Sequence, residues 1–156
     1  MEAQSDWYNR AVKELNLHRD TLSKKDAKKY KLDLLLRIVK RVDDFSSYCG
    51  ECQSFKGEIT GLIVELGTLV QLTDNKAGRR SHNKATATIV KHLQKTHKLV
   101  SEGYYKGIWM AIGTGIGVAI GAALGNASIG TPLGIGIGLA VGSYLDKKAK
   151  QEGKVI

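Results

Sequence analysis

Two cysteines and two of the four histidines have the residue types and spacing of a metal-binding set. Cys49 and Cys52 form a CxxC pair, and His92 and His97 are separated by four residues. Two Cys and two His side chains bind zinc tetrahedrally, and both spacings occur in structural zinc sites. The interval between the pairs is too long for a compact zinc finger, but it suits ligands on two packed helices. The sequence therefore predicts zinc as a structural cofactor.

The histidine pair presents a geometric difficulty for this interpretation. Five residues of α-helix turn through 500°, so the side chains of His92 and His97 point about 140° apart. They converge only if the helix loosens near its end. Two other interpretations stay open. The cysteines lie on an apolar helix face and can be core residues, with the histidines at the surface. A CxxC pair can also be redox-active, although no βαβ pattern surrounds this one.

Other chemistry-bearing motifs are missing from the sequence. It contains no G-x-S-x-G, no H-E-x-x-H and no P-loop lysine motif,. The GIGTGIG segment resembles a phosphate loop but lies inside an apolar run. We therefore expect no catalytic residues, no enzyme activity and no small-molecule substrate. Nucleic-acid binding is not expected either, because the basic residues show no helix-turn-helix or zinc-finger pattern.

The N-terminal part, residues 1–106, predicts a basic helical head domain. Residues 6–22 have helical apolar spacing, with Ser5 and Asp6 as candidate caps,. Apolar residues then step by threes and fours over residues 35–69, and a break near Gly50 would divide this helix into two. Residues 73–84 predict a polar loop by composition, and a last helix is expected over residues 85–100. Three or four helices would pack as a small cytoplasmic bundle.

The C-terminal part predicts a transmembrane helical hairpin over residues 107–146, followed by a basic cytoplasmic tail, residues 147–156. From Gly107 to Leu145 there is no Asp, Glu, Lys or Arg. Residues 107–125 and 129–145 would span about 28 and 25 Å as helices, close to the thickness of a bilayer core. Thr131 followed by Pro132 predicts the start of the second helix. The expected fold class is therefore all-α.

A β-hairpin is the competing interpretation of the same apolar residues. Small and large side chains alternate from Ala111 onward, and strict alternation is a strand signal,. One face of such a strand would be nearly all glycine, which weakens strand interiors. The segment lengths also favour helices.

Glycines recur every four residues in both apolar segments, as in a glycine zipper. Such a row opens a groove along a helix and lets two backbones approach closely in lipid. The rows consist of Gly113, Gly117, Gly121 and Gly125 in the first segment and Gly130, Gly134, Gly138 and Gly142 in the second. A further small face contains Gly115 together with Ala111, Ala119 and Ala123. One face would serve the hairpin and the other a neighbouring subunit, so a homo-oligomer is expected. A compact monomeric anchor is the alternative.

The charge distribution predicts how the hairpin lies in a membrane. The chain carries a net charge of +9, and lysines flank both ends of the apolar stretch. The positive-inside rule places both ends in the cytoplasm, next to anionic lipid of the inner (cytoplasmic) membrane. The first residues show no signal-peptide pattern, so we expect both termini to be cytoplasmic and the cysteines to be reduced.

Three segments resemble a group of small bacterial proteins that have a Cys/His helical head and a tandem glycine-zipper hairpin. They are CGEC at 49–52, KHLQKTHKLVSEGYY at 91–105, and the tail that includes IGTGIGVAIGAALGN and LDKKAKQEGKVI. The resemblance implies membrane hairpins and paired Cys and His ligands, and it implies no reaction. The hairpin has no buried carboxylate of the kind that rotor rings use, which argues against proton translocation.

Together these patterns predict a self-associating integral membrane protein. Its glycine-zipper hairpins would assemble into an oligomeric pore or channel that the cytoplasmic head controls. The competing function is that of a non-conducting scaffold or sensor, anchored in the membrane, whose head binds a partner.

Overall fold

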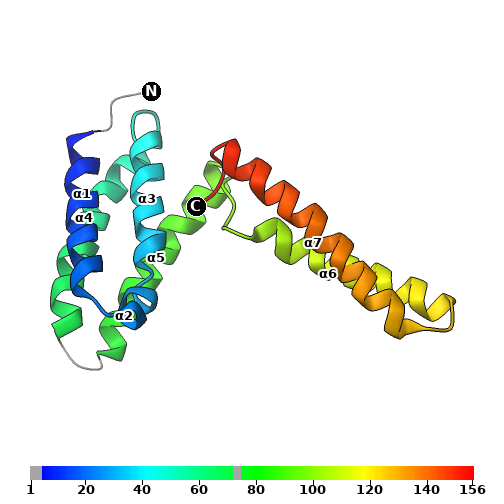
Figure 1. The fold of residues 1–156 in the computed structure, drawn as a ribbon. Helices are drawn as coiled ribbons and strands as arrows, with labels where there is room; N and C mark the ends of the chain where they lie inside the picture. The colour runs from blue at the N-terminus through cyan, green and yellow to red at the C-terminus, as the bar shows by residue number, and fades with distance from the viewer. Residues whose placement is uncertain (1–4, 72–74) are drawn as a thin grey trace. The chain divides into compact units, whose positions relative to one another are not determined.

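The computed structural model describes residues 5–71 and 75–156, and every helix or strand element assigned there is an α-helix (Figure 1). The expected all-α class is confirmed, and the β-hairpin interpretation of the apolar segments is wrong. The chain divides into two compact units. One is the head, which ends at His97 and also includes Ile156, and the other runs from Lys98 to Val155.

The described part of the head contains five helices: α1 (Asp6–Thr21), α2 (Lys24–Lys29), α3 (Leu32–Phe45), α4 (Gly50–Gln71) and α5 (Lys76–Thr96). Helix α1 begins where the sequence predicts, because the Ser5 hydroxyl accepts a hydrogen bond from the backbone N–H of Tyr8,. The predicted break near Gly50 is also present and separates α3 from α4.

The loop expected over residues 73–84 is wrong for the residues that are described. Helix α5 already begins at Lys76, because the Asn75 side chain accepts a hydrogen bond of 2.8 Å from the N–H of Gly78. His82 and Thr86 then point inward and are buried despite their polarity. Helix α5 also ends at Thr96 rather than at residue 100. Residues 72–74 lie outside the described residues.

The core of the head holds α3, α4 and α5 together. Helix α3 contacts both α4 and α5, and α4 contacts α5. Most fully buried side chains are aliphatic, and those from these three helices and α1 include Leu15, Leu35, Ile38, Val39, Val42, Cys52, Ile59, Leu66, Ile89 and Leu93. The start of α4 lies beside the end of α5, as the closeness of Cys49 and Cys52 to His92 and His97 shows.

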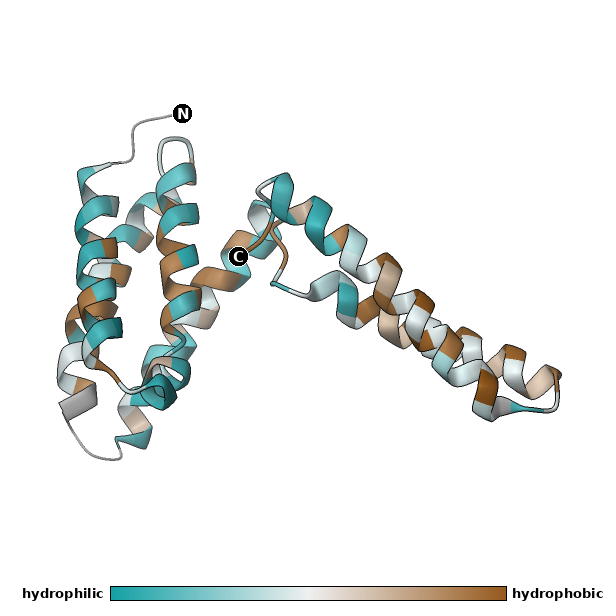
Figure 2. Ribbon diagram, in the orientation of Figure 1, coloured by the Kyte–Doolittle hydropathy of each residue, from teal (hydrophilic) through white to brown (hydrophobic). Residues whose placement is uncertain are grey.

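The second unit is a pair of tightly packed helices, α6 (Tyr104–Ala123) and α7 (Ala127–Gln151) (Figure 1). By length and composition both could cross a membrane. Figure 2 shows the hairpin mainly in brown and near-white, with hydrophilic residues gathered at the end where α6 begins and α7 ends. The predicted helix start at Pro132 is wrong. Helix α7 begins at Ala127 and contains Pro132 in its second turn, where one missing N–H leaves only the Ser128 carbonyl without its helical donor,.

Glycines form the contact between α6 and α7. Gly113, Gly117 and Gly121 are buried in α6. A Cβ atom added at Gly117 would lie 3.0 Å from the Cα of Gly134, and one added at Gly134 would lie 2.8 Å from the Cα of Gly117. These distances are shorter than ordinary carbon contacts, so no other residue type fits without moving a helix.

The remaining glycines of the two rows divide into two kinds. Gly130, Gly138 and Gly142 face the backbone of α6 just as closely. Gly125 does not, contrary to the expected packing role. Its backbone has a φ of 73°, a left-handed conformation that glycine adopts readily. Its N–H donates a hydrogen bond to the carbonyl of Ala122, so Gly125 terminates α6,. Gly115 has open space around its Cβ position.

Candidate metal centre

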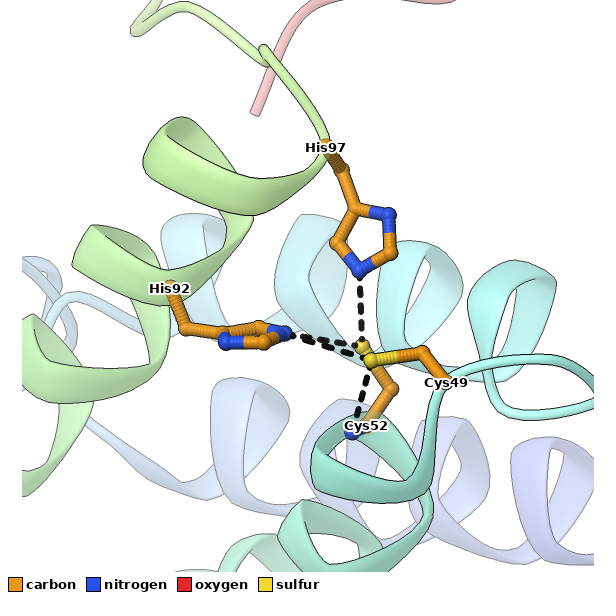
Figure 3. Close-up of side chains that lie close together, drawn as sticks. All are labelled: Cys49, Cys52, His92 and His97. Atoms are coloured by element: carbon orange, nitrogen blue, oxygen red, sulfur yellow. Dashed lines mark hydrogen bonds between the residues drawn. The ribbon is translucent and has the colours of Figure 1, made fainter.

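The two cysteines lie at the start of α4. Cys49 immediately precedes the helix, and its sulfur accepts a hydrogen bond of 3.5 Å from the backbone N–H of Cys52. Free N–H groups and the helix dipole stabilise a thiolate at such a position. Cys52 lies one turn further on, fully buried, and its side chain faces the same point as that of Cys49 (Figure 3).

The two histidines converge because the second one lies just outside α5. His92 is helical, whereas His97 follows the last helical residue, with φ of −99° and ψ of 4°. Lys98 then adopts a left-handed conformation, with φ of 56°. This change of backbone direction removes the angular difficulty that a continuous helix would impose, and both Nε2 atoms point at the sulfurs (Figure 3).

The four predicted ligand residues form one cluster, and their donor atoms all lie within 4.8 Å of one another. The Nε2 atom of His92 is 3.4 Å from the Cys49 sulfur and 3.6 Å from the Cys52 sulfur. The Nε2 atom of His97 is 3.3 Å from the Cys52 sulfur. Tetrahedral zinc, with its usual bonds to sulfur and nitrogen, separates such donors by about 3.6 Å. The donor set and its spacing therefore fit zinc.

A carboxylate holds His92 in the orientation that a metal needs. Glu51 lies 2.9 Å from the Nδ1 atom of His92, and the Thr96 hydroxyl is 3.4 Å from the same atom. A carboxylate at Nδ1 keeps the proton there and leaves the Nε2 lone pair for a metal ion. Glu51 lies inside the CxxC pair, but its sequence position does not reveal its contact with His92.

Aromatic rings fix the second histidine. The imidazole of His97 stacks on Phe45, with ring centroids 4.0 Å apart and planes within 2° of parallel. Phe55 lies edge-on to His92 at 5.3 Å. The rings limit how far either imidazole can rotate. The sequence does not mark these phenylalanines as site residues, since each also belongs to the apolar residues that recur over residues 35–69.

The charges of the cluster favour a divalent cation. Burial, together with Cys49 and Glu51 nearby, raises the pKa of the Cys52 thiol to about 12. Without a cation, Cys52 is therefore a neutral thiol at pH 7. Burial and the neighbouring His92 lower the pKa of His97, so its ring is neutral and its lone pair is available. Two thiolates would balance the two positive charges of a zinc ion. The loaded site would then carry no net charge, which burial would otherwise penalise.

Comparisons of the chain with family models, with curated proteins and with solved structures found no match. What the geometry defines is a small all-helical protein with a Cys2His2 cluster in its head and two long apolar helices packed as a hairpin.

Proposed function

We propose that this chain is an integral membrane protein whose hairpins self-associate into a pore, and that zinc bound in the head stabilises the part that controls it. The membrane is the first element of this proposal. Large apolar side chains are exposed along both helices: Ile108, Met110, Ile112, Ile116, Val118, Ile120, Leu124, Ile129, Leu133, Ile137 and Leu139. So large an exposed apolar surface needs lipid or another protein surface to cover it.

Self-association rests on one observation: the contact inside the hairpin uses one small face of α6 and leaves the other open. Gly113, Gly117 and Gly121 are buried against α7. The second small face, Ala111, Gly115, Ala119 and Ala123, is exposed. Small exposed residues at four-residue spacing allow close backbone contact with a further helix in lipid.

Helix α7 carries an equivalent opening. Gly136 is two residues, or about 200° of helix, from Gly134, which contacts α6. A Cβ atom added at Gly136 would meet nothing within 4 Å, and Ala140, one turn on, is exposed. Each hairpin thus offers a small face on the outer side of each helix. Contact between the α6 side of one copy and the α7 side of the next is heterologous, and heterologous contacts that close generate rings.

The head is connected to the hairpin at a metal ligand. His97 is the last residue of the contiguous head, and residues 98–103 lead directly to α6. Zinc held by Cys49, Cys52, His92 and His97 would fix the backbone where the chain leaves the head. Loss of the ion would free that segment, which gives the head a means to influence the hairpin.

A non-conducting anchor is the second candidate, and the chemistry of the spans favours it. Residues 107–145 contain no charged side chain, and most of their exposed side chains are apolar. A narrow lumen lined by such residues would hold water poorly. In that case the oligomer would present several heads to a partner without conducting ions.

Ion flux separates the two candidates. Purified protein is reconstituted in liposomes loaded with a potassium-sensitive dye, with Gly115→Leu as the variant and Ile116→Leu as the matched control. The proposal expects flux from wild type and the control, and none from Gly115→Leu. Wild-type oligomers without flux at a high protein-to-lipid ratio would leave the anchor as the function. A monomeric wild-type protein would overturn both the oligomeric pore and the oligomeric anchor.

A further inference from the structure

The charged end of the hairpin contains a hollow of about 270 Å³ between the start of α6 and the last turns of α7. Three lysines and two carboxylates line it, so positive groups outnumber negative ones: Lys106 from α6, Asp146, Lys147 and Lys150 from α7, and Glu102 from the segment before α6. The hollow lies wholly within the second unit, where the hydrophilic residues of the hairpin gather (Figure 2). We propose that it binds the phosphate of an anionic phospholipid headgroup, an inference that rests on the proposed membrane insertion.

One of the two lining carboxylates, Asp146, is engaged by the backbone of α6. Both carboxylate oxygens of Asp146 accept backbone hydrogen bonds from the start of α6, from Tyr105 at 3.0 Å and from Lys106 at 3.1 Å. This contact caps α6 and ties the two helices together at the mouth of the hollow.

Two other lysines near the end of α7 form ion pairs outside the hollow. Lys148 pairs with Glu152 at 4.0 Å, and Lys154 pairs with the same carboxylate at 2.7 Å. Neither of them lines the hollow. Lys148 and Lys154 therefore provide controls of equal charge outside the hollow.

The position of the hollow favours a lipid phosphate over a soluble anion. It lies where the uncharged spans end, which is the depth of the headgroups if the spans cross a bilayer. Exposed Tyr104 and Tyr144 lie at the same level of the two helices, and aromatic rings favour that interface,. Ser143 adds a hydroxyl to the lining. Long lysine side chains reach from the apolar surface toward phosphate in this way.

Quenching of Trp109 by brominated lipid tests the site directly. Trp109 follows Lys106 by one helical turn, and Trp7→Phe removes the only other tryptophan. The full chain carrying Trp7→Phe is reconstituted in phosphatidylcholine vesicles that contain a minor fraction of brominated phosphatidylglycerol or, in parallel, of brominated phosphatidylcholine. Each lysine near an anionic lipid contributes roughly a fivefold preference. We expect the anionic lipid to be enriched beside Trp109 by at least about fivefold.

The matched variants are Lys106→Gln with Lys147→Gln, and Lys148→Gln with Lys154→Gln, which remove the same number of charges. The first pair should lose most of the enrichment, and the second pair should retain it. Equal quenching by both lipids in the parent protein, or equal losses in both variants, would overturn the site. Inorganic phosphate that abolishes the preference at constant ionic strength would reassign the site to a soluble anion. No quenching by either lipid would overturn membrane insertion itself, and the site with it.

Discussion

The carboxylate of Glu51 contacts His92 on the side of the ring that faces away from the two sulfurs. Its side chain is largely exposed, so the ion pair by itself contributes little to folding,. The role of Glu51 is to set the tautomer of His92, a proposed metal ligand. Groups in this position typically change metal affinity by 10- to 100-fold.

Zinc content tests the residue-level proposal. Purified protein should contain about one zinc ion per chain, and Cys49→Ser should lose the ion and melt at a lower temperature, because structural zinc contributes directly to folding. Glu51→Ala should retain the fold but bind zinc roughly 10- to 100-fold more weakly. Glu58→Ala, an exposed site on the same helix, is the control. Metal analysis that finds far less than one equivalent in unchelated protein would contradict the assignment.

His82 is a second histidine-based feature of the head, distant in sequence from the metal ligands. Its side chain is fully buried edge-on to Tyr30, with ring centroids 5.7 Å apart. Neither ring nitrogen meets hydrogen-bond geometry with a described residue. Burial lowers the pKa of His82, which outweighs the opposing influence of the Tyr30 backbone and the Glu65 carboxylate.

The lowered pKa of His82 predicts that acid destabilises the head. Below the ordinary histidine pKa of 6.5 the unfolded chain takes up a proton that the folded protein resists. The contribution of neutral His82 to stability is therefore complete above that pH and is lost as the pH falls from 6.5 toward the lower folded-state value. The slope can reach about 1.4 kcal/mol per pH unit. Denaturant unfolding of wild type and His82→Leu should give a shallower pH dependence for the variant. Parallel curves would show that His82 does not titrate on unfolding.

Sequence reasoning found the four ligand residues but not how they meet. Their types and spacing are local properties, which a pattern can reveal. The convergence of His92 and His97 depends on where α5 ends and on the left-handed backbone of Lys98, which no spacing rule contains. Phe45 and Glu51 were missed for the same reason, since only tertiary packing gives them their partners.

At the scale of elements, periodicity predicted the helices that bury an apolar face and failed where polar residues are buried. The apolar faces of α3 and α4 and the apolar hairpin were predictable because apolar residues recur along them in the sequence. The start of α5 was not. Its first turns read as a loop by composition, yet Asn75 caps them and buried His82 keeps them in place. The start of α7 was missed because Pro132 is tolerated in its second turn.

The two small faces of α6 should respond differently to a bulky side chain. Gly117→Leu places its side chain against the α7 backbone at Gly130 and Gly134, so it should open the hairpin. Gly115→Leu meets nothing within the chain and should leave the hairpin closed while weakening contact between copies,. Hairpin closure is measured by crosslinking of cysteine pairs placed across α6 and α7, in a Cys49→Ser, Cys52→Ser background.

The control for both glycine variants is Ile116→Leu, a similar apolar side chain on the exposed surface of α6. Oligomer mass in mild detergent should fall for Gly115→Leu and stay unchanged for the control. If Gly115→Leu assembles like wild type, the open face of α6 is not an interface between copies. If Gly117→Leu crosslinks as well as wild type, the glycine contact does not close the hairpin.

For the whole molecule, the arrangement of the two spans determines which charged groups share a side of the membrane. Packed antiparallel helices bring Lys106 and Lys147 to the same end of the hairpin, where Asp146 joins the two helices. The connection at the other end, residues 124–126, carries no charge. Insertion as a hairpin would require only the uncharged connection to cross, so we expect both lysine-flanked ends to stay on the cytoplasmic side.

Trypsin digestion of membrane vesicles tests this topology. Trypsin cleaves after Lys and Arg, and residues 107–146 contain neither. In inside-out vesicles of producing bacteria, the protease should remove the head and the tail and leave a protected fragment that begins after Lys98 or Lys106 and ends at one of the lysines from 147 to 154. In right-side-out vesicles the chain should stay intact. A protected fragment that retains an intact terminus would mean that only one helix crosses, and complete digestion would mean that the hairpin lies outside the bilayer.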